Sequence, residues 1–134
     1  IILIGSVQAE MTPADTAPYS MAKAAIQHLA GILALELAPY HINVNVIHPG
    51  WIDTPGEREM LGDALVDAGG PAVPWGRLGT PADIGEAAAF LASEAADYIT
   101  GATLRVDGGF ILGLRPPHRD PHAPASPAGE ETIS

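Results

Sequence analysis

Three short apolar segments alternate with two stretches of helical pattern along this chain, and this alternation limits the fold more than any other feature. The apolar segments cover residues 1–5, 42–47 and 102–106, and the helical stretches cover residues 19–38 and 81–92. Strands that alternate with helices run parallel, because each helix returns the chain to the same end of the sheet. The sequence therefore predicts an α/β fold, a parallel sheet with helices on its faces.

The ends of these elements are marked by residues that start or stop a helix. Pro39 ends the first helical stretch, and Pro49-Gly50 ends the second strand. Residues 80–83, Thr-Pro-Ala-Asp, combine an N-cap threonine, a proline at the first helical position and an acid two positions later. This pattern predicts the start of a helix. A shorter helix is expected over residues 57–67.

The composition changes after Gly113. Five prolines and few apolar residues follow, which is typical of a segment that cannot form a core. We therefore divide the chain into an α/β unit over residues 1–112 and a proline-rich, disordered tail over residues 113–134. His118 and His122 in this tail are interpreted as solvated side chains.

Charge and composition exclude several kinds of partner. The net charge is −10 with only 6 lysines and arginines, whereas binding to nucleic acid or to an anionic membrane needs clustered positive charge. No uninterrupted apolar run reaches the ~18 residues of a membrane span. The absence of cysteine excludes disulfides and thiolate metal sites and fits a reducing compartment. We expect a cytoplasmic protein with no bound metal, nucleic acid or membrane.

Tyr19 and Lys23 stand four residues apart at the start of the first helical stretch, so they share one helix face. An ammonium group near a phenol favours the phenolate, and such a tyrosine can donate or accept a proton at a substrate oxygen. The spacing also occurs by chance in many helices. The pair alone is therefore interpreted by default as a surface contact, and only its context favours a catalytic role.

Ser6 follows the first strand directly, at the end of the sheet where open α/β folds place their sites. There its hydroxyl could hydrogen-bond the oxygen that Tyr19 protonates, or it could simply satisfy a turn. A serine hydrolase is excluded, because the nucleophile elbow requires Gly-x-Ser-x-Gly and the sequence here is Ile-Gly-Ser-Val-Gln over residues 4–8.

Together with later segments, these residues resemble the C-terminal half of a short-chain dehydrogenase/reductase. The resemblance covers about residues 1–110. Its motifs, in chain order, are Gly5-Ser6 after a strand, Tyr19-x-x-x-Lys23, the Ile-Asn-Val-Asn-Val-Ile strand, His48-Pro49-Gly50-Trp51-Ile52-Asp53-Thr54, Gly76-Arg77-Leu78-Gly79-Thr80-Pro81 and Val106-Asp107-Gly108-Gly109. It implies part of a doubly wound, Rossmann-like fold and the NAD(P)(H)-dependent interconversion of an alcohol and a carbonyl compound.

The resemblance also implies a role for each candidate residue. Tyr19 would be the acid/base, Ser6 would orient the substrate oxygen, and Lys23 would support Tyr19 and bind the nicotinamide ribose. Ile52 would act through its backbone and Thr54 through its hydroxyl, although an ordinary loop is the alternative for this segment. The implied cofactor-binding residues are Tyr19, Lys23, Pro49, Gly50, Ile52 and Thr54.

The chain departs from the family pattern at its start. The family's glycine-rich turn, its adenosine-selecting residue and its catalytic asparagine all precede the strand at residues 1–5, and no Gly-x-Gly-x-x-Gly spacing occurs here. We interpret the chain as part of a longer one and expect it to bind a dinucleotide weakly or not at all. NAD and NADP both remain open, as does the substrate.

A second hypothesis is a catalytically inactive fragment that serves only in assembly. The alanine-rich helix over residues 19–38, interpreted as broken at Gly31, has small residues suited to close helix packing, and the family resemblance implies a homo-oligomer formed through it. Packing inside one subunit is the alternative. Trp51 and Trp75 are expected either to line a substrate pocket or to pack.

Overall fold

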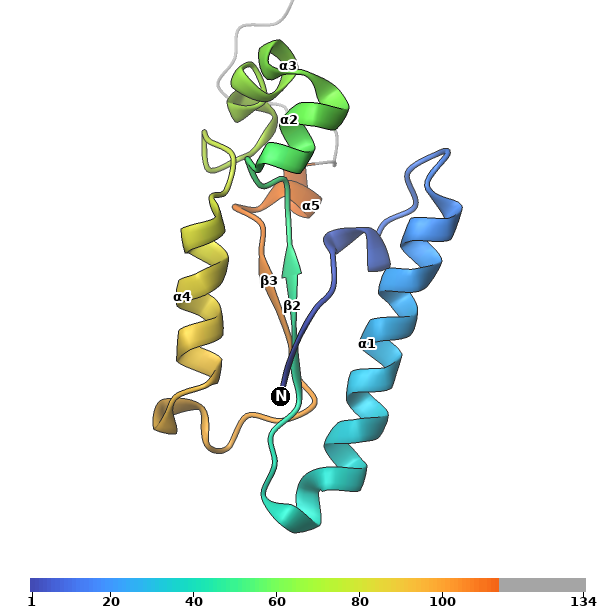
Figure 1. The fold of residues 1–134 in the computed structure, drawn as a ribbon, viewed down its shortest axis with the longest axis vertical. Helices are drawn as coiled ribbons and strands as arrows, with labels where there is room; N and C mark the ends of the chain where they lie inside the picture. The colour runs from blue at the N-terminus through green and yellow to red at the C-terminus, as the bar shows by residue number, and fades with distance from the viewer. Residues whose placement is uncertain (114–134) are drawn as a thin grey trace, which may run out of the picture.

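A computed structural model of the chain describes residues 1–113; the predictions for the tail, including His118 and His122, lie outside the described residues. The described part contains a three-stranded parallel sheet in the order β1-β2-β3 (Figure 1). The strands are β1 (Ile2–Ile4), β2 (Asn45–Pro49) and β3 (Thr103–Val106). Leu3 pairs with Val46, and Ile47 pairs with Leu104. The predicted α/β fold with parallel strands is therefore confirmed.

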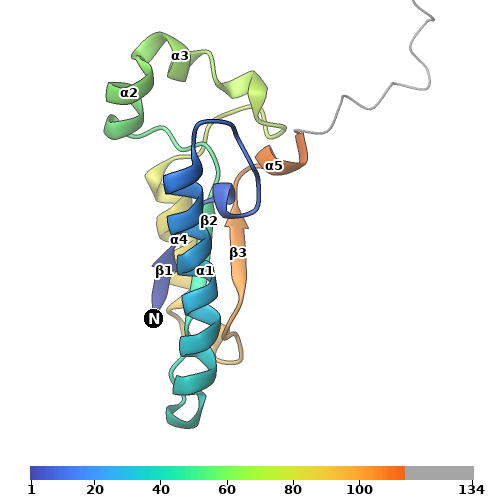
Figure 2. The same ribbon diagram turned by 90° about the vertical axis from the view of Figure 1, so that its right-hand side faces the viewer.

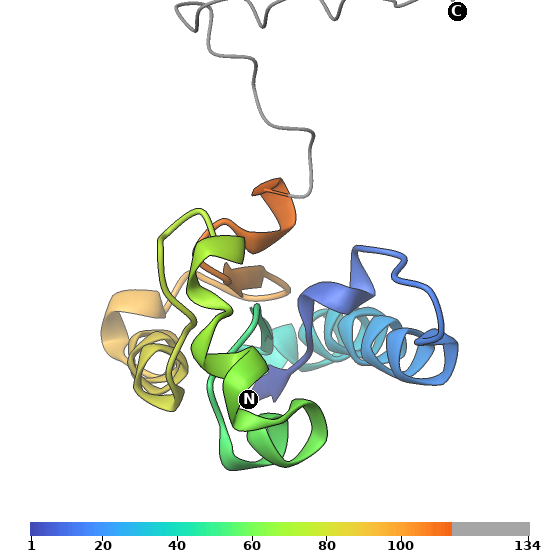
Figure 3. The ribbon, with the colours of Figure 1, turned by 90° about the horizontal axis from the view of Figure 1, so that it is seen from above.

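Two long helices cover opposite faces of the sheet. Figures 1 and 3 show the strands between α1 (Ala17–Leu37) and α4 (Pro81–Leu91). Successive side chains of β2 point to opposite faces. Val46 belongs to a buried cluster with residues of α1, whereas Ile47 belongs to another with Leu91 of α4. This is why the central strand is apolar on both faces.

Shorter elements complete the described part, and some of them form a third apolar cluster. That cluster, of Val66, Val73 and Leu78 with Trp51 and Phe110, lies beyond the carboxyl ends of the strands, as the position of α2, α3 and α5 in Figure 2 indicates. The helices are α2 (Pro55–Leu61), α3 (Asp63–Asp67) and α5 (Phe110–Gly113), and the short 3₁₀ helices are η1 (Val7–Ala9), η2 (Ala38–Tyr40), η3 (Gly70–Ala72) and η4 (Glu94–Ala96).

The second predicted strand is displaced along the chain. It begins three residues later than predicted, because the Val44 N–H donates to the Thr100 hydroxyl (3.1 Å) and the Ile42 N–H donates to the Leu37 carbonyl (3.4 Å). It also continues two residues beyond the predicted end at Ile47, as far as Pro49, because Pro49 still pairs with Val106 on β3.

Two helix predictions are also wrong in detail. The helix predicted over residues 57–67 is two helices, since Gly62 between them has a φ of 85°, which no helix allows. Gly31 does not break α1, which runs without interruption from Ala17 to Leu37. A glycine within a helix weakens it without necessarily ending it.

By length and composition, α1 and η2 together (Ala17–Tyr40) are long and apolar enough to cross a membrane. The most apolar 18-residue window in this stretch has a mean hydropathy of 1.2, and 11% of that window is buried. The sequence contains no uninterrupted apolar run of this length, because Lys23 and Glu36 interrupt the stretch. A single helix of this kind is weak evidence for a membrane span. The inner side of α1 packs Ala30 and Ala34 against β2.

The start of α4 is held by a capping box and an ion pair. The Asp83 N–H donates to the Thr80 hydroxyl (3.3 Å), and the Thr80 N–H donates to the Asp83 carboxylate (2.7 Å). Arg77 donates to both carboxylate oxygens of Asp83 at 2.8 Å. The Arg77 guanidinium and the Thr80 donors hold the pKa of Asp83 well below its usual range.

This cap predicts a specific loss of stability in acid. Because the pKa of Asp83 is lower in the folded than in the unfolded chain, its carboxylate stabilises the fold above the unfolded value of about 3.9, and this contribution is lost as the pH falls through the folded value. The difference in free energy of unfolding between wild type and Asp83→Ala, measured by urea denaturation, should shrink below about pH 4. Glu59→Ala, on the exposed side of α2, is the control. A constant difference down to about pH 2 would contradict this linkage.

Candidate active site

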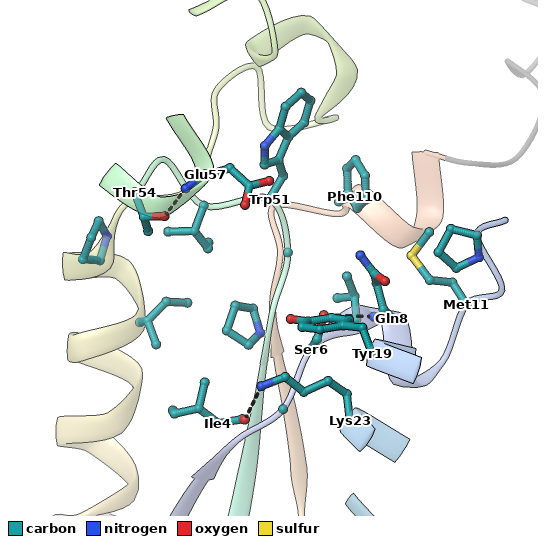
Figure 4. A pocket seen from close by; sticks show the side chains of 18 residues that line it. Ile4, Ser6, Gln8, Met11, Tyr19, Lys23, Trp51, Thr54, Glu57 and Phe110 are labelled. Carbon is teal, nitrogen blue, oxygen red and sulfur yellow. Dashed lines mark hydrogen bonds between the residues drawn. The ribbon is translucent and has the colours of Figure 1, made fainter. Parts of the chain in front are cut away.

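A cleft of about 620 Å³ opens beyond the carboxyl ends of β1 and β2, between the starts of α1 and α2 (Figure 4). Five separate segments of the chain supply its walls. Every residue predicted for the site lines this one cleft: Ser6, Tyr19, Lys23, Pro49, Gly50, Ile52 and Thr54.

Ser6 is buried at the point where β1 passes into η1. The Gly5 N–H continues the ladder by donating to the Ile47 carbonyl (2.8 Å), and Ser6 caps η1 by accepting from the Gln8 N–H (3.2 Å). A serine hydroxyl also has one hydrogen to donate. No acceptor among residues 1–113 takes that hydrogen, so it is available to a substrate oxygen in the cleft.

Tyr19 and Lys23 lie together on the first turns of α1, as their spacing predicts. Tyr19 is 48% exposed and faces the cleft beside Ser6 (Figure 4). The Lys23 Nζ donates to the Ile4 carbonyl at the end of β1 (3.1 Å) and stands 5.5 Å from the centre of the Tyr19 ring, within the range of a cation–π contact. The ammonium is therefore held between the strand end and the phenol.

The opposite wall is the loop that leads from β2 into α2. Thr54 caps α2 by accepting from the Glu57 N–H (3.2 Å), which leaves its own hydroxyl hydrogen free to donate. Around Ile52, the Gly79 N–H donates to the Trp51 carbonyl and the Asp53 N–H to the Gly79 carbonyl. No backbone acceptor within the described part of the chain takes the Ile52 N–H.

A cluster of ion pairs around Arg58 holds this loop against the two short helices that follow it. Arg58 donates to both carboxylate oxygens of Asp53 at 2.7 Å, and to Asp63 and Asp67 on α3 at 3.1 and 3.0 Å. The Arg58 side chain lowers the pKa of Asp53, and the three carboxylates raise the pKa of the Arg58 guanidinium. The cluster therefore connects the loop after Ile52 to both short helices.

Several residues of the cleft were not predicted from the sequence. Most of them, though not Ile84 on α4, lie in loops or short helices, where no periodic pattern marks an inward-facing side chain. Trp51 lines the cleft and also packs edge-on against Phe110, with ring centres 6.4 Å apart, so both of its expected roles apply. Trp75 is 74% exposed and borders a separate hollow of about 250 Å³. The unpredicted lining residues include Gln8, Met11, Glu57, Ile84 and Phe110.

A parallel sheet between two helical layers, with a cleft beyond the carboxyl ends of its strands, defines a Rossmann-like α/β protein. A family model described as "Enoyl-(Acyl carrier protein) reductase" matches residues 1–111. The chain belongs to the short-chain dehydrogenase/reductase family.

Two relatives show how much of such a protein the chain represents. It is 47% identical over 113 residues to 3-oxoacyl-[acyl-carrier-protein] reductase FabG of Salmonella typhimurium, covering 84% of this chain and 46% of FabG. It is 39% identical over 114 residues to 3-oxoacyl-[acyl-carrier-protein] reductase MabA of Mycobacterium tuberculosis, covering 84% of this chain and 45% of MabA. The chain thus spans less than half the length of these relatives.

Solved structures agree with this assignment. Acetoin dehydrogenase YohF from Salmonella typhimurium superposes with a TM-score of 0.72 at 38% identity, over 84% of this chain and 43% of YohF. YwfH, an NADPH dependent reductase involved in bacilysin biosynthesis, superposes with a TM-score of 0.75 at 31% identity, over 82% of this chain and 46% of YwfH. Residues 1–113 contain no group of three or more His, Cys, Asp or Glu side chains placed to hold a metal ion.

Proposed function

We propose that these residues supply the catalytic half of an NAD(P)(H)-dependent oxidoreductase that interconverts an alcohol and a carbonyl compound. The observation that carries the proposal is the convergence of Ser6, Tyr19 and Lys23 in one cleft, with the Ser6 hydroxyl hydrogen uncommitted. Family membership supports it, because the matched relatives are reductases by name.

In the direction of reduction, the Tyr19 hydroxyl donates its proton to the carbonyl oxygen while the carbonyl carbon receives the hydride. The Ser6 hydroxyl donates a hydrogen bond to the same oxygen and so stabilises the negative charge that develops on it. Lys23, held near the phenol by the Ile4 carbonyl, stabilises the phenolate that remains. The oxidation of the alcohol follows the same path in reverse.

The free donors on the opposite wall fit the nicotinamide end of the cofactor, which supplies or accepts the hydride when bound. The Ile52 N–H and the Thr54 hydroxyl would hold the carboxamide, and Lys23 would hold the ribose. Pro49 and Gly50 form the adjoining surface. Nothing in this half favours NAD over NADP.

The names of the relatives suggest the first substrate to test. FabG and MabA are 3-oxoacyl reductases, and the cleft has apolar side chains from Val7, Met11 and Phe110 beside the polar groups. We therefore propose a 3-oxoacyl thioester as the probe substrate. The protein is further proposed to be cytoplasmic, to act without nucleic acid or membrane, and to form a homo-oligomer.

The function can be tested in a chimera that places residues 1–113 after the part of Salmonella typhimurium FabG that precedes its matched region. We expect the chimera to oxidise NADPH in the presence of a 3-oxoacyl thioester, followed by the absorbance of NADPH. The 134-residue chain alone is the control, and titration of NADH and NADPH, followed by the fluorescence of Trp51 and Trp75, should show weak binding or none. A folded chimera that binds NADPH but shows no turnover would contradict the proposal.

An assembly role without catalysis is the second candidate, and the outer side of α1 favours it. Met21, Leu29, Ile32 and Leu35 are exposed there, and Leu35 is 79% exposed. Such side chains suit a contact with a second helix. Turnover by the chimera would exclude a purely structural role, whereas oligomers that form without turnover would support it.

A further inference from the structure

His48 is a buried titratable side chain that the proposed chemistry does not use. It lies on β2 immediately before Pro49, and its side chain is 0% exposed. Its Nδ1 is 2.9 Å from Glu10 Oε1. An ionised carboxylate only accepts hydrogen bonds, so we assign the hydrogen to Nδ1. Nε2 is buried and has no hydrogen-bond partner within residues 1–113.

The other edge of the same ring lies against Gly5. A Cβ atom at position 5 would stand 2.6 Å from His48 Nε2, closer than real side chains approach. Gly5 immediately precedes Ser6 and η1 in the chain, and Glu10 immediately follows them. One imidazole therefore contacts both ends of the segment that carries the Ser6 hydroxyl.

A third residue extends this connection across the sheet. Arg105 on β3 is paired in register with His48, and its guanidinium is 3.7 Å from Glu10 Oε2. The Glu10 carboxylate is thus held from two strands, by His48 on β2 and by Arg105 on β3. Both contacts fix the end of η1 relative to the sheet.

We propose that His48 and Glu10 are positioning residues, which hold the segment from Gly5 to Glu10 and thereby place the Ser6 hydroxyl in the cleft. The role of the Ser6 hydroxyl in catalysis rests on the proposed function. The contact between His48 and Glu10 does not depend on it. His48 acts as a hydrogen-bond donor to Glu10 and as a surface for Gly5, without touching substrate or cofactor.

Amide hydrogen exchange in the 134-residue chain tests the positioning directly. The reporters are the Gln8 N–H, bonded to Ser6 Oγ, and the Ala9 N–H, bonded to the Ser6 carbonyl (3.0 Å). In Glu10→Ala both amides should exchange about tenfold faster, because a hydrogen bond to a charged group is lost. The Val46 N–H, bonded to the Ala102 carbonyl (2.9 Å), should be unchanged.

Two conservative variants separate positioning from a general loss of stability. Glu10→Gln keeps an acceptor for Nδ1 and should stay within about threefold of wild type. His48→Asn keeps a donor near Nδ1 but loses the ring edge on Gly5, so it should accelerate exchange at Gln8. Unchanged exchange in Glu10→Ala, or an increase shared equally by Val46, would overturn the inference.

Activity in the chimera gives an independent readout. Glu10→Ala should lower kcat about tenfold with the KM for NADPH unchanged, and Glu10→Gln should restore it. If the chimera has no activity, the proposed function is wrong. The hydrogen-exchange measurement would still test whether His48 and Glu10 hold the segment around Ser6. If kcat is insensitive to Glu10 in an active chimera, the positioning is irrelevant to Ser6 and the inference is wrong.

Discussion

Replacement of Tyr19 by phenylalanine should lower kcat of the chimera by a factor of about 10² to 10⁴, the usual contribution of a general acid or base. The variant loses only the hydroxyl that gives its proton to the substrate oxygen, and the ring can keep its place beside Lys23. The KM for NADPH should therefore stay within about threefold, since the loss falls on the transition state. Steady-state NADPH oxidation at varied substrate and cofactor concentrations measures both constants.

Tyr98→Phe is the matched control, because Tyr98 is fully exposed and does not line the cleft. It should leave kcat unchanged. Lys23→Met should lower kcat and raise the KM for NADPH together, since Lys23 is proposed to serve both the phenol and the cofactor. Equal turnover in wild type and Tyr19→Phe would remove Tyr19 from the chemistry and leave the cleft without an acid/base.

Gly50→Ala should destabilise the fold by about 1 to 3 kcal/mol or more, the usual cost of forcing extra atoms into a packed site. A Cβ atom at position 50 would lie 2.6 Å from both Cα and Cβ of Asp107, at the end of β3. The backbone of Asp107 cannot move aside as a flexible side chain could. Alanine at position 50 would therefore force the ends of β2 and β3 apart. The Gly50 N–H bond to the Val106 carbonyl (3.1 Å) would be strained as well.

Gly31→Ala is the control for this substitution. Apart from its chain neighbours and the backbone of α1 itself, no atom lies within 4 Å of a Cβ at position 31, so alanine there should raise the free energy of unfolding by roughly 0.5 to 1 kcal/mol. Urea denaturation of the 134-residue chain measures both variants. Equal effects at the two positions would show that the approach of Gly50 to Asp107 is not as close as described.

The elements that the sequence predicts well are those with local signals. The cap at Thr80 locates the start of α4 to the residue, and the apolar runs locate β1 and β3 to within a residue at each end, because these features depend on neighbours in the chain. The candidate site was also predictable, since parallel strands bring residues after each carboxyl end to one edge of the sheet.

Other features depend on contacts that no local pattern contains. The pair of Glu10 and His48 joins residues 38 positions apart, and nothing around either residue indicates the other. The start of β2 is decided by the distant Thr100 hydroxyl, which takes the Val44 N–H. The contact between Trp51 and Phe110 likewise requires α5, whose four residues are too few for a recognisable period.

The central position of β2 has a consequence for how the molecule unfolds. Both neighbouring strands and both long helices contact this one segment of five residues, and two of the three apolar clusters include its side chains. None of these four elements can detach from the sheet without exposing part of β2 to solvent. Loss of the sheet core should therefore be a single cooperative transition, in which β1, β3, α1 and α4 melt at the same denaturant concentration.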